Sequence, residues 1–187
     1  MRVIAGEFRS RRLKSLSGSS TRPTPDRLRE TLFDVLSPRI ADCVFMDVYA
    51  GTGAVGIEAL SRGARRAIFI EKNRAAVAVI RENLAALGLE NRAEVFTSKA
   101  TTVLERVRAD IAFLDPPYEA VKEYEMSMSA LEKSETPLVI IQHSPRFTPQ
   151  KEYGDVRLYR VINQGDNSLS FYQRRSEAAE SGCGQRA

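Results

Sequence analysis

The sequence contains few of the residues that build disulfide frameworks or metal sites. Its 187 residues include two cysteines and a single histidine. Cys43 and Cys183 are too far apart in the chain to indicate a disulfide framework, and no ligand spacing typical of a zinc site is present. Cys43 opens an apolar run and is expected in the core. We therefore expect a protein that binds no metal.

Long apolar runs are also missing. No stretch approaches the roughly 20 apolar residues that are needed to span a bilayer. The first residues, Met1 to Glu7, lack the apolar segment of a signal peptide. The composition is 43% hydrophobic and 28% charged, which is typical of a soluble globular protein. We expect a cytoplasmic protein without membrane contacts.

The length fits one domain, which we expect over residues 1–175. Within it, residues 1–22 are predicted to form a small basic β-hairpin and a linker. Residues 176–187 are polar and small, and we expect them to be a disordered tail.

The net charge of +4 is unevenly distributed along the chain. Residues 1–29 contain eight basic and two acidic side chains, a net charge of +6, so the other 158 residues sum to −2. This segment indicates an anionic partner such as RNA, although a solvated flexible arm would have the same composition. The basic side chains that we expect to contact RNA are Arg2, Arg9, Arg11, Arg12, Lys14, Arg22 and Arg27.

Apolar strands and amphipathic helices alternate through the middle of the chain, which predicts a doubly wound, mostly parallel sheet. A first helix is expected to begin with Thr24 as its cap and Pro25 as its first residue, and to end near Ser37. Two antiparallel strands are expected over 153–162 and 168–174. The parallel strands are predicted near 43–48, 67–71, 93–97, 109–114 and 137–142, and the helices near 54–62, 74–87, 99–107 and 120–133.

A glycine-rich turn follows the first of these strands. Gly51, Gly53 and Gly56 have the GxGxxG spacing in a strand–turn–helix context, which is compatible with NAD, FAD or S-adenosylmethionine. Asp47 precedes the turn and Glu71 ends the next strand, 20 residues after Gly51. Glu71 is placed to accept hydrogen bonds from a ribose diol. An acid at Asp47 suits the amino group of S-adenosylmethionine better than the pyrophosphate of a dinucleotide, because two anions would meet.

The tetrapeptide Asp115-Pro116-Pro117-Tyr118 follows a buried strand and suits transfer to an exocyclic amino group. Such a nitrogen is a poor nucleophile because its lone pair is delocalised into the ring. The Asp115 carboxylate and the Pro116 carbonyl can accept its two hydrogens and localise that lone pair. Tyr118 can stack on the base, and stacking is worth roughly 1–3 kcal/mol per base. His143 offers another base, but a histidine at an apolar strand end is more often structural.

Together these motifs resemble class I S-adenosylmethionine-dependent methyltransferases that modify amino groups. More narrowly, the chain resembles the RsmD family, bacterial methyltransferases of guanine N2 in 16S ribosomal RNA. The supporting stretches are 2–6, 22–33 and 168–172, and the resemblance covers about residues 1–174. It implies a Rossmann-like class I fold with a seven-stranded, mostly parallel sheet and an antiparallel last strand. It also implies 16S RNA as partner, within an assembled or assembling small subunit, and we expect a monomer.

The resemblance also implies roles for individual positions. Asp115 to Tyr118 would hold a flipped guanine, and Thr24, Arg27 and Glu30 would lie near the entrance. The residues implied in binding S-adenosylmethionine are Asp47, Tyr49, Ala50, Gly51, Thr52, Gly53, Glu71, Lys72, Asn73, Ala100 and Asp115.

Three positions depart from the family pattern. Tyr49 replaces the usual Phe and leaves a hydroxyl to satisfy. The third strand ends at Thr97 without the acid that often lies near the adenine, so backbone amides are expected there. Gln142-His143 stands where relatives often carry Glu-His.

Three alternatives share part of this pattern. A DNA adenine-N6 methyltransferase would use the same tetrapeptide, but such enzymes usually add a recognition domain. A protein glutamine methyltransferase would carry Asn in place of Asp115. A noncatalytic ribosome-assembly factor that binds RNA and has kept the fold is the alternative of a different class.

Overall fold

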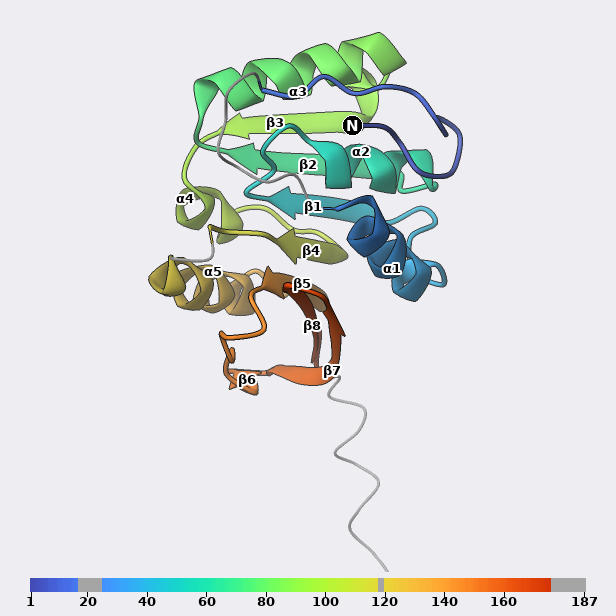
Figure 1. Ribbon diagram of the computed structural model, residues 1–187. Coiled ribbons are helices and arrows are strands. Elements are labelled where there is room, and N and C mark those ends of the chain that lie inside the picture. The colour runs from blue at the N-terminus through green and yellow to red at the C-terminus, as the bar shows by residue number, and fades with distance from the viewer. Residues whose placement is uncertain (17–24, 118–119, 176–187) are drawn as a thin grey trace, which may run out of the picture.

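The computed structural model describes residues 1–16, 25–117 and 120–175. An eight-stranded sheet with the order β3-β2-β1-β4-β5-β8-β7-β6 runs through the molecule (Figure 1). Its first five strands are parallel: β1 (Val44–Val48), β2 (Arg66–Glu71), β3 (Ala93–Thr97), β4 (Ile111–Leu114) and β5 (Leu138–His143). The last three pair antiparallel: β6 (Glu152–Tyr153), β7 (Val156–Gln164) and β8 (Asn167–Arg174).

This sheet confirms the predicted fold, with one more strand than the predicted seven. The extra strand, β6, has two residues, and the sequence prediction joined it to β7 as one strand over 153–162. Gly154, whose φ of 54° is left-handed, makes the turn that separates Tyr153 from β7. Every parallel strand predicted from its apolar run is present, and the central strands β1, β4 and β5 are buried because helices cover both faces of the sheet there.

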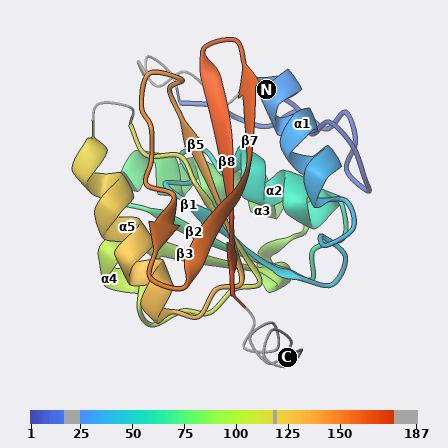
Figure 2. The same ribbon diagram turned by 90° about the horizontal axis from the view of Figure 1, so that it is seen from below.

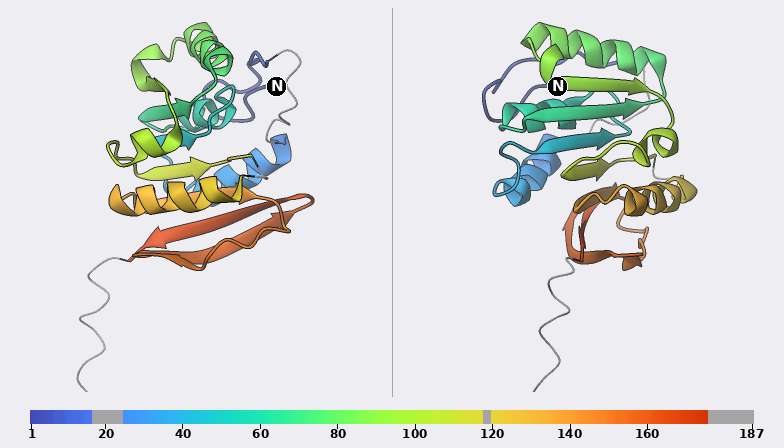
Figure 3. Two further views of the ribbon diagram at one scale, coloured as in Figure 1. Left: turned by 90° about the vertical axis from the view of Figure 1, so that its left-hand side faces the viewer. Right: turned by 180° about the vertical axis from the view of Figure 1, so that it is seen from behind.

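The helices are α1 (Asp26–Leu36), α2 (Ala54–Ser61), α3 (Arg74–Leu87), α4 (Ala100–Leu104) and α5 (Val121–Lys133), with a 3₁₀ turn at Glu90–Arg92. Helices α4 and α5 lie on one side of the strands and α1 and α2 on the other (Figure 2). The two further views show the same layers (Figure 3). Successive strand residues serve opposite cores: Met46 and Val48 face the α4–α5 layer, and Phe45 the α1 layer.

Helix boundaries differ from the predictions in two places. Helix α1 starts at Asp26, so Pro25 occupies the N-cap position, one residue before its predicted place; the predicted cap Thr24 lies outside the described residues. Helix α1 ends at Leu36, before the proline, as predicted. Helix α4 is shorter than the predicted 99–107: Lys99 is its N-cap, and the helix ends at Leu104.

The described part of the chain contains neither a membrane span nor a metal cluster. No helix there has the length and apolar character needed to cross a bilayer. No group of three or more His, Cys, Asp or Glu side chains there is placed to hold a metal ion. Cys43 is buried, as expected for a core residue, whereas Cys183 lies outside the described residues together with the predicted tail.

The N-terminal segment, residues 1–14, forms a minimal version of the predicted hairpin. Its two arms pair antiparallel at a bridge between Arg2 and Arg12, and the Val3 and Leu13 amides donate to the Arg11 and Met1 carbonyls, each at 3.0 Å. The segment also bonds to α2: the amides of Ile4 and Ala5 donate to the buried Glu58 carboxylate, at 2.8 and 3.0 Å. These tertiary bonds satisfy donors that lie beyond the short pairing.

A substitution at Gly6 tests this docking. Gly6 has a φ of 83°, and a Cβ there would lie 1.9 Å from the Ser61 carbonyl oxygen. Gly6→Ala should therefore lower the free energy of unfolding by about 2–4 kcal/mol through strain and overpacking. The matched control is Gly165→Ala, because Gly165 has a φ of 60° but open space around its Cβ. Equal shifts of the urea midpoint in both variants would contradict tight docking of this segment.

Candidate functional site

Three predicted acids meet at the carboxyl ends of neighbouring strands. Asp47 is the fourth residue of β1, Glu71 is the last residue of β2, and Asp115 directly follows β4. The Asp115 amide donates to the Val48 carbonyl at 3.3 Å. Strand order reverses between β1 and β4, and open α/β sheets bind ligands at such a crevice.

Asp47 is buried, whereas Glu71 and Asp115 are partly exposed. The Asp47 side chain accepts a hydrogen bond from the Gly56 amide at 2.8 Å. Burial raises the pKa of Asp47 to about 8; the Gly56 bond opposes this, and the charges of Asp115 and Glu71 add to it. A cation near this carboxyl would favour its ionised form.

Glu71 fixes the glycine turn. One carboxylate oxygen accepts from the Gly51 amide at 2.9 Å and the other from the Asn73 amide at 2.7 Å. Asn73 in turn caps α3 through the Ala75 amide at 2.9 Å. Gly53, with a φ of 80°, occupies the N-cap of α2. The predicted cofactor residues Gly51, Glu71 and Asn73 therefore form one hydrogen-bonded unit, with Gly53 next to it at the start of α2.

A cavity of about 330 Å³ opens beside this unit, between the ends of β2 and β3 and helix α5. This volume suits a small-molecule site. Three predicted cofactor residues, Tyr49, Lys72 and Ala100, line it. The other lining residues are Ile70, Ser98, Lys99, Thr101, Lys122, Glu123 and Met126. These residues fit S-adenosylmethionine. The Glu71 carboxylate bonds the glycine turn at the end of β2, and the next residue, Lys72, lines the cavity.

Tyr49 connects the turn after β1 to helix α5. Its hydroxyl lies 2.6 Å from a Glu123 carboxylate oxygen and 2.8 Å from the Ser127 hydroxyl. Burial, followed by the bond to Glu123, raises the Tyr49 pKa well above its ordinary value. The hydroxyl that the sequence left to be satisfied is thus bonded, by partners 74 and 78 positions away that no sequence signal indicated.

Removing this hydroxyl should destabilise the protein. Tyr49→Phe removes the hydroxyl that bonds Glu123 and the buried Ser127, and we expect a loss of about 1–2 kcal/mol in the free energy of unfolding. Urea unfolding measures the loss. Tyr159→Phe is the control, because Tyr159 is 49% exposed. Equal midpoints for the wild type and Tyr49→Phe would show that the bond contributes nothing to stability.

The tetrapeptide after β4 is held by Tyr124. The hydroxyl of this fully buried residue lies 3.3 Å from the Pro116 carbonyl oxygen and 3.2 Å from the Gln142 carbonyl oxygen. Its ring stacks on Phe147 with centroids 4.7 Å apart. Pro116 is buried and Pro117 exposed, while Tyr118 lies outside the described residues. The sequence predicts Tyr124 only as part of a helix, so sequence reasoning missed its positioning role.

His143, at the end of β5, has both ring nitrogens engaged. Nδ1 lies 2.8 Å from the Ser144 carbonyl oxygen and Nε2 lies 2.8 Å from the Ser170 hydroxyl. Burial lowers the His143 pKa, which keeps the ring neutral near pH 7. These bonds agree with the structural role that was favoured for this residue.

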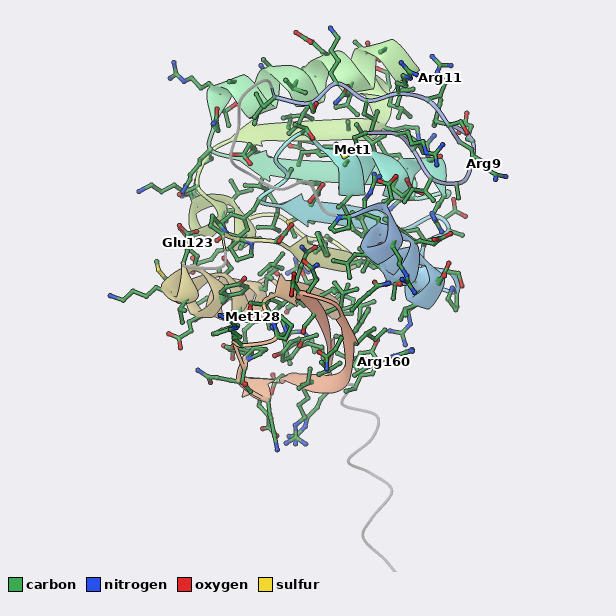
Figure 4. The ribbon with its side chains drawn as sticks, in the orientation of Figure 1. Met1, Arg9, Arg11, Glu123, Met128 and Arg160 are labelled. Atoms are coloured by element: carbon green, nitrogen blue, oxygen red, sulfur yellow. The ribbon has the colours of Figure 1, made fainter. Side chains whose placement is uncertain are left out.

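The predicted RNA-contacting side chains that the structure describes are exposed, and two of them lie away from the site. Arg2, Arg12 and Arg27 are exposed, Lys14 pairs with Glu82 at 2.9 Å, and Arg22 lies outside the described residues. Arg9 and Arg11 lie at the opposite end of the strands from Glu123, which lines the cavity (Figure 4). Contact of these side chains with RNA stays a prediction.

A glycine turn at the end of β1, an acid at the end of β2 and a parallel sheet that closes with antiparallel strands together define a Rossmann-like methyltransferase fold. The model of the family described as "Conserved hypothetical protein 95" matches residues 1–173. The chain belongs to this family, the RsmD family of S-adenosylmethionine-dependent methyltransferases.

Individual relatives agree with this assignment. YlbH of Bacillus subtilis, to which an rRNA methyltransferase activity is ascribed, is 32% identical over 94% of this chain and 100% of its own length. Ribosomal RNA small subunit methyltransferase D of Escherichia coli is 43% identical over 63% of this chain and 60% of its own. The solved structure of YhhF from Escherichia coli, which is described as a methyltransferase, is 33% identical to this chain and has a TM-score of 0.83. The match covers 95% of this chain and 99% of that one.

Proposed function

We propose that this protein transfers a methyl group from S-adenosylmethionine to the exocyclic N2 of a guanine in 16S ribosomal RNA. The observation that carries the proposal is the placement of Asp115 and the Pro116 carbonyl beside the glycine turn, at the reversal of strand order. Relatives of the same family are named ribosomal RNA small subunit methyltransferase D, which supports the substrate.

The residues of the chain would divide the chemistry between them. When bound, S-adenosylmethionine supplies a methyl group on a positively charged sulfur. Asp47 would bind its amino group and Glu71 its ribose, next to the turn that both acids already hold. The protein then contributes mainly proximity and alignment.

At the other side of the site, Asp115 would accept one hydrogen of the guanine amino group. The Pro116 carbonyl, held by Tyr124, has a second lone pair with which to accept the other. Asp115 or water would take up the proton that N2 releases. The base must leave its stack, which costs a few kcal/mol and less in a loop.

The setting of the reaction is also part of the proposal. We infer that a preassembled small subunit would present the base to a monomeric enzyme in the cytoplasm. Binding through phosphates would make the affinity depend strongly on salt.

A transfer assay with a labelled methyl group tests the function. Undermodified small subunits, naked 16S RNA and duplex DNA are offered separately, and the labelled nucleoside is identified after digestion. We expect label in N2-methylguanosine from the subunits. Label in N6-methyladenine would favour the DNA adenine alternative, and no label despite measured cofactor binding would favour the noncatalytic assembly factor.

A further inference from the structure

Three lysines from separate elements line the cavity beside the glycine turn. Lys72 follows β2, Lys99 precedes α4, and Lys122 lies in the first turn of α5; all three are exposed. Lys72 lies 3.8 Å from Glu123, whereas Lys99 and Lys122 have no ion-pair partner among residues 1–16, 25–117 and 120–175. We call Lys72, Lys99 and Lys122 the lysine rim.

Apolar side chains accompany this rim on α5. Met126 lines the same cavity and is 56% exposed, and Val121, next to Lys122, is 45% exposed. Large exposed apolar groups beside charged ones mark interaction surfaces. A base or ribose next to a bound phosphate would contact such a group.

The charge of the cofactor does not account for three lysines together, although Lys72 is also one of the predicted cofactor residues. S-adenosylmethionine carries a sulfonium, an amino group and one carboxylate, so its net charge is positive and three nearby lysines repel it. The groups that attract its cations are Asp47 and Glu71, which lie inward of the rim. The charges therefore divide into Asp47 and Glu71 inside, towards the cofactor, and a rim towards solvent where three lysines outnumber one carboxylate, Glu123.

A polyanion at the cavity mouth explains this division. Phosphates on either side of a flipped base follow it within one or two nucleotides, so they must lie close to Asp115. Arg9 and Arg11 are at the opposite end of the strands and are too far away to bind those phosphates (Figure 4).

We propose that the lysine rim, with Met126, is the surface that binds the RNA backbone flanking the target base. The proposal rests on the proposed function, since it assigns the path of the substrate across the same site. The lysines neutralise the flanking phosphates, and those phosphates in turn relieve the repulsion between the rim and the cofactor. RNA and S-adenosylmethionine should therefore strengthen each other's binding.

A pair of matched double variants tests the surface. Lys99→Ala/Lys122→Ala removes two unpaired charges of the rim, and Arg9→Ala/Arg11→Ala removes two charges at the other end of the strands. Binding to 16S RNA and to undermodified small subunits is measured by filter retention between about 50 and 300 mM salt, a range over which phosphate contacts are strongly salt-dependent. Calorimetry measures S-adenosylmethionine affinity, and thermal melting confirms that both variants are folded.

We expect the lysine variant to bind RNA about tenfold more weakly at roughly 100 mM salt. The slope of log affinity against log salt should fall by about 1.4–1.8, the value for two lost phosphate contacts. Affinity for S-adenosylmethionine alone should be unchanged or higher. The arginine variant should lose less RNA affinity than the lysine variant, because Arg9 and Arg11 can contact only RNA that lies farther from the target base.

Two outcomes would overturn the proposal. One is unchanged RNA affinity in the lysine variant, and the other is a loss of S-adenosylmethionine affinity of the same size as the loss of RNA affinity, which would assign the lysines to the cofactor. Failure of the proposed function is separate, because it would show as absent methyl transfer by the wild type. In that case, lysine-dependent RNA binding would still support the surface.

Discussion

Replacement of Asp115 by alanine should abolish methyl transfer while the RNA stays bound. Without the carboxylate, nothing at this position accepts a hydrogen of the guanine amino group or aligns its lone pair. A directed acceptor of this kind contributes about 10²–10⁴ in rate, so we expect kcat to fall by about 10³ or more. Single-turnover transfer to undermodified small subunits measures the rate, and RNA affinity should stay within about threefold.

The Asp115→Asn variant separates charge from shape. Asparagine keeps the size of the side chain but presents an amide donor that faces the guanine hydrogens, so we expect a loss of about 10² or more. Asp110→Ala is the matched control at the other end of β4. Its carboxylate accepts from the Val44 amide at 2.7 Å, so its loss should lower stability and leave kcat unchanged. Full turnover by Asp115→Ala would remove this residue from the mechanism.

The parts of the fold that local sequence determines were predicted well. Strand β4 is an unbroken apolar run because helices cover both its faces, and such a run has one structural explanation in an α/β pattern. The meeting of Asp47, Glu71 and Asp115 also followed from sequence, since parallel strands end at the same edge. The alternation of strands and helices was therefore enough to assign residues far apart in the chain to one site.

Contacts across the fold could not be predicted in this way. Tyr124 and Ser127 read as members of a helical stripe, and only the packing of α5 against the ends of β4 and β5 gives them Pro116 and Tyr49 as partners. The N-terminal hairpin shows the same limit. Its alternation correctly indicated a pair of arms, but no sequence signal indicated the bonds from the Ile4 and Ala5 amides to Glu58 of α2.

The sequence reveals how much charge the chain carries but not where charges from separate elements meet. The excess of arginine near the N-terminus is a property of sequence, whereas the rim of Lys72, Lys99 and Lys122 exists only because three loops end at one edge of the sheet. A count of charges along the chain therefore detects the N-terminal arginines but not the lysine rim. Electrostatic predictions for this class of fold therefore gain most from strand order.

The pH dependence of cofactor binding should report on Asp47. Its folded pKa, raised to about 8 by burial, exceeds the unfolded value of about 3.9, so the folded protein holds a proton there at neutral pH. The stability that this proton contributes is complete below about pH 4 and is lost as pH rises through about 8. The ionised form that a cationic ligand needs is therefore scarce at pH 6 and abundant at pH 9.

Binding of S-adenosylmethionine beside this carboxyl should expel the proton. Below about pH 8, affinity should rise by up to roughly tenfold per pH unit, and close to one proton should be released at pH 7. Calorimetry in two buffers of different ionisation enthalpy measures that release. Asp47→Asn is the control that cancels titration of the ligand's own amino group, and we expect it to bind more weakly with no such pH dependence. Equal proton release by both proteins would place the cofactor's cation away from Asp47, and the acid at the end of β1 would then serve only to hold the N-terminus of α2 through Gly56.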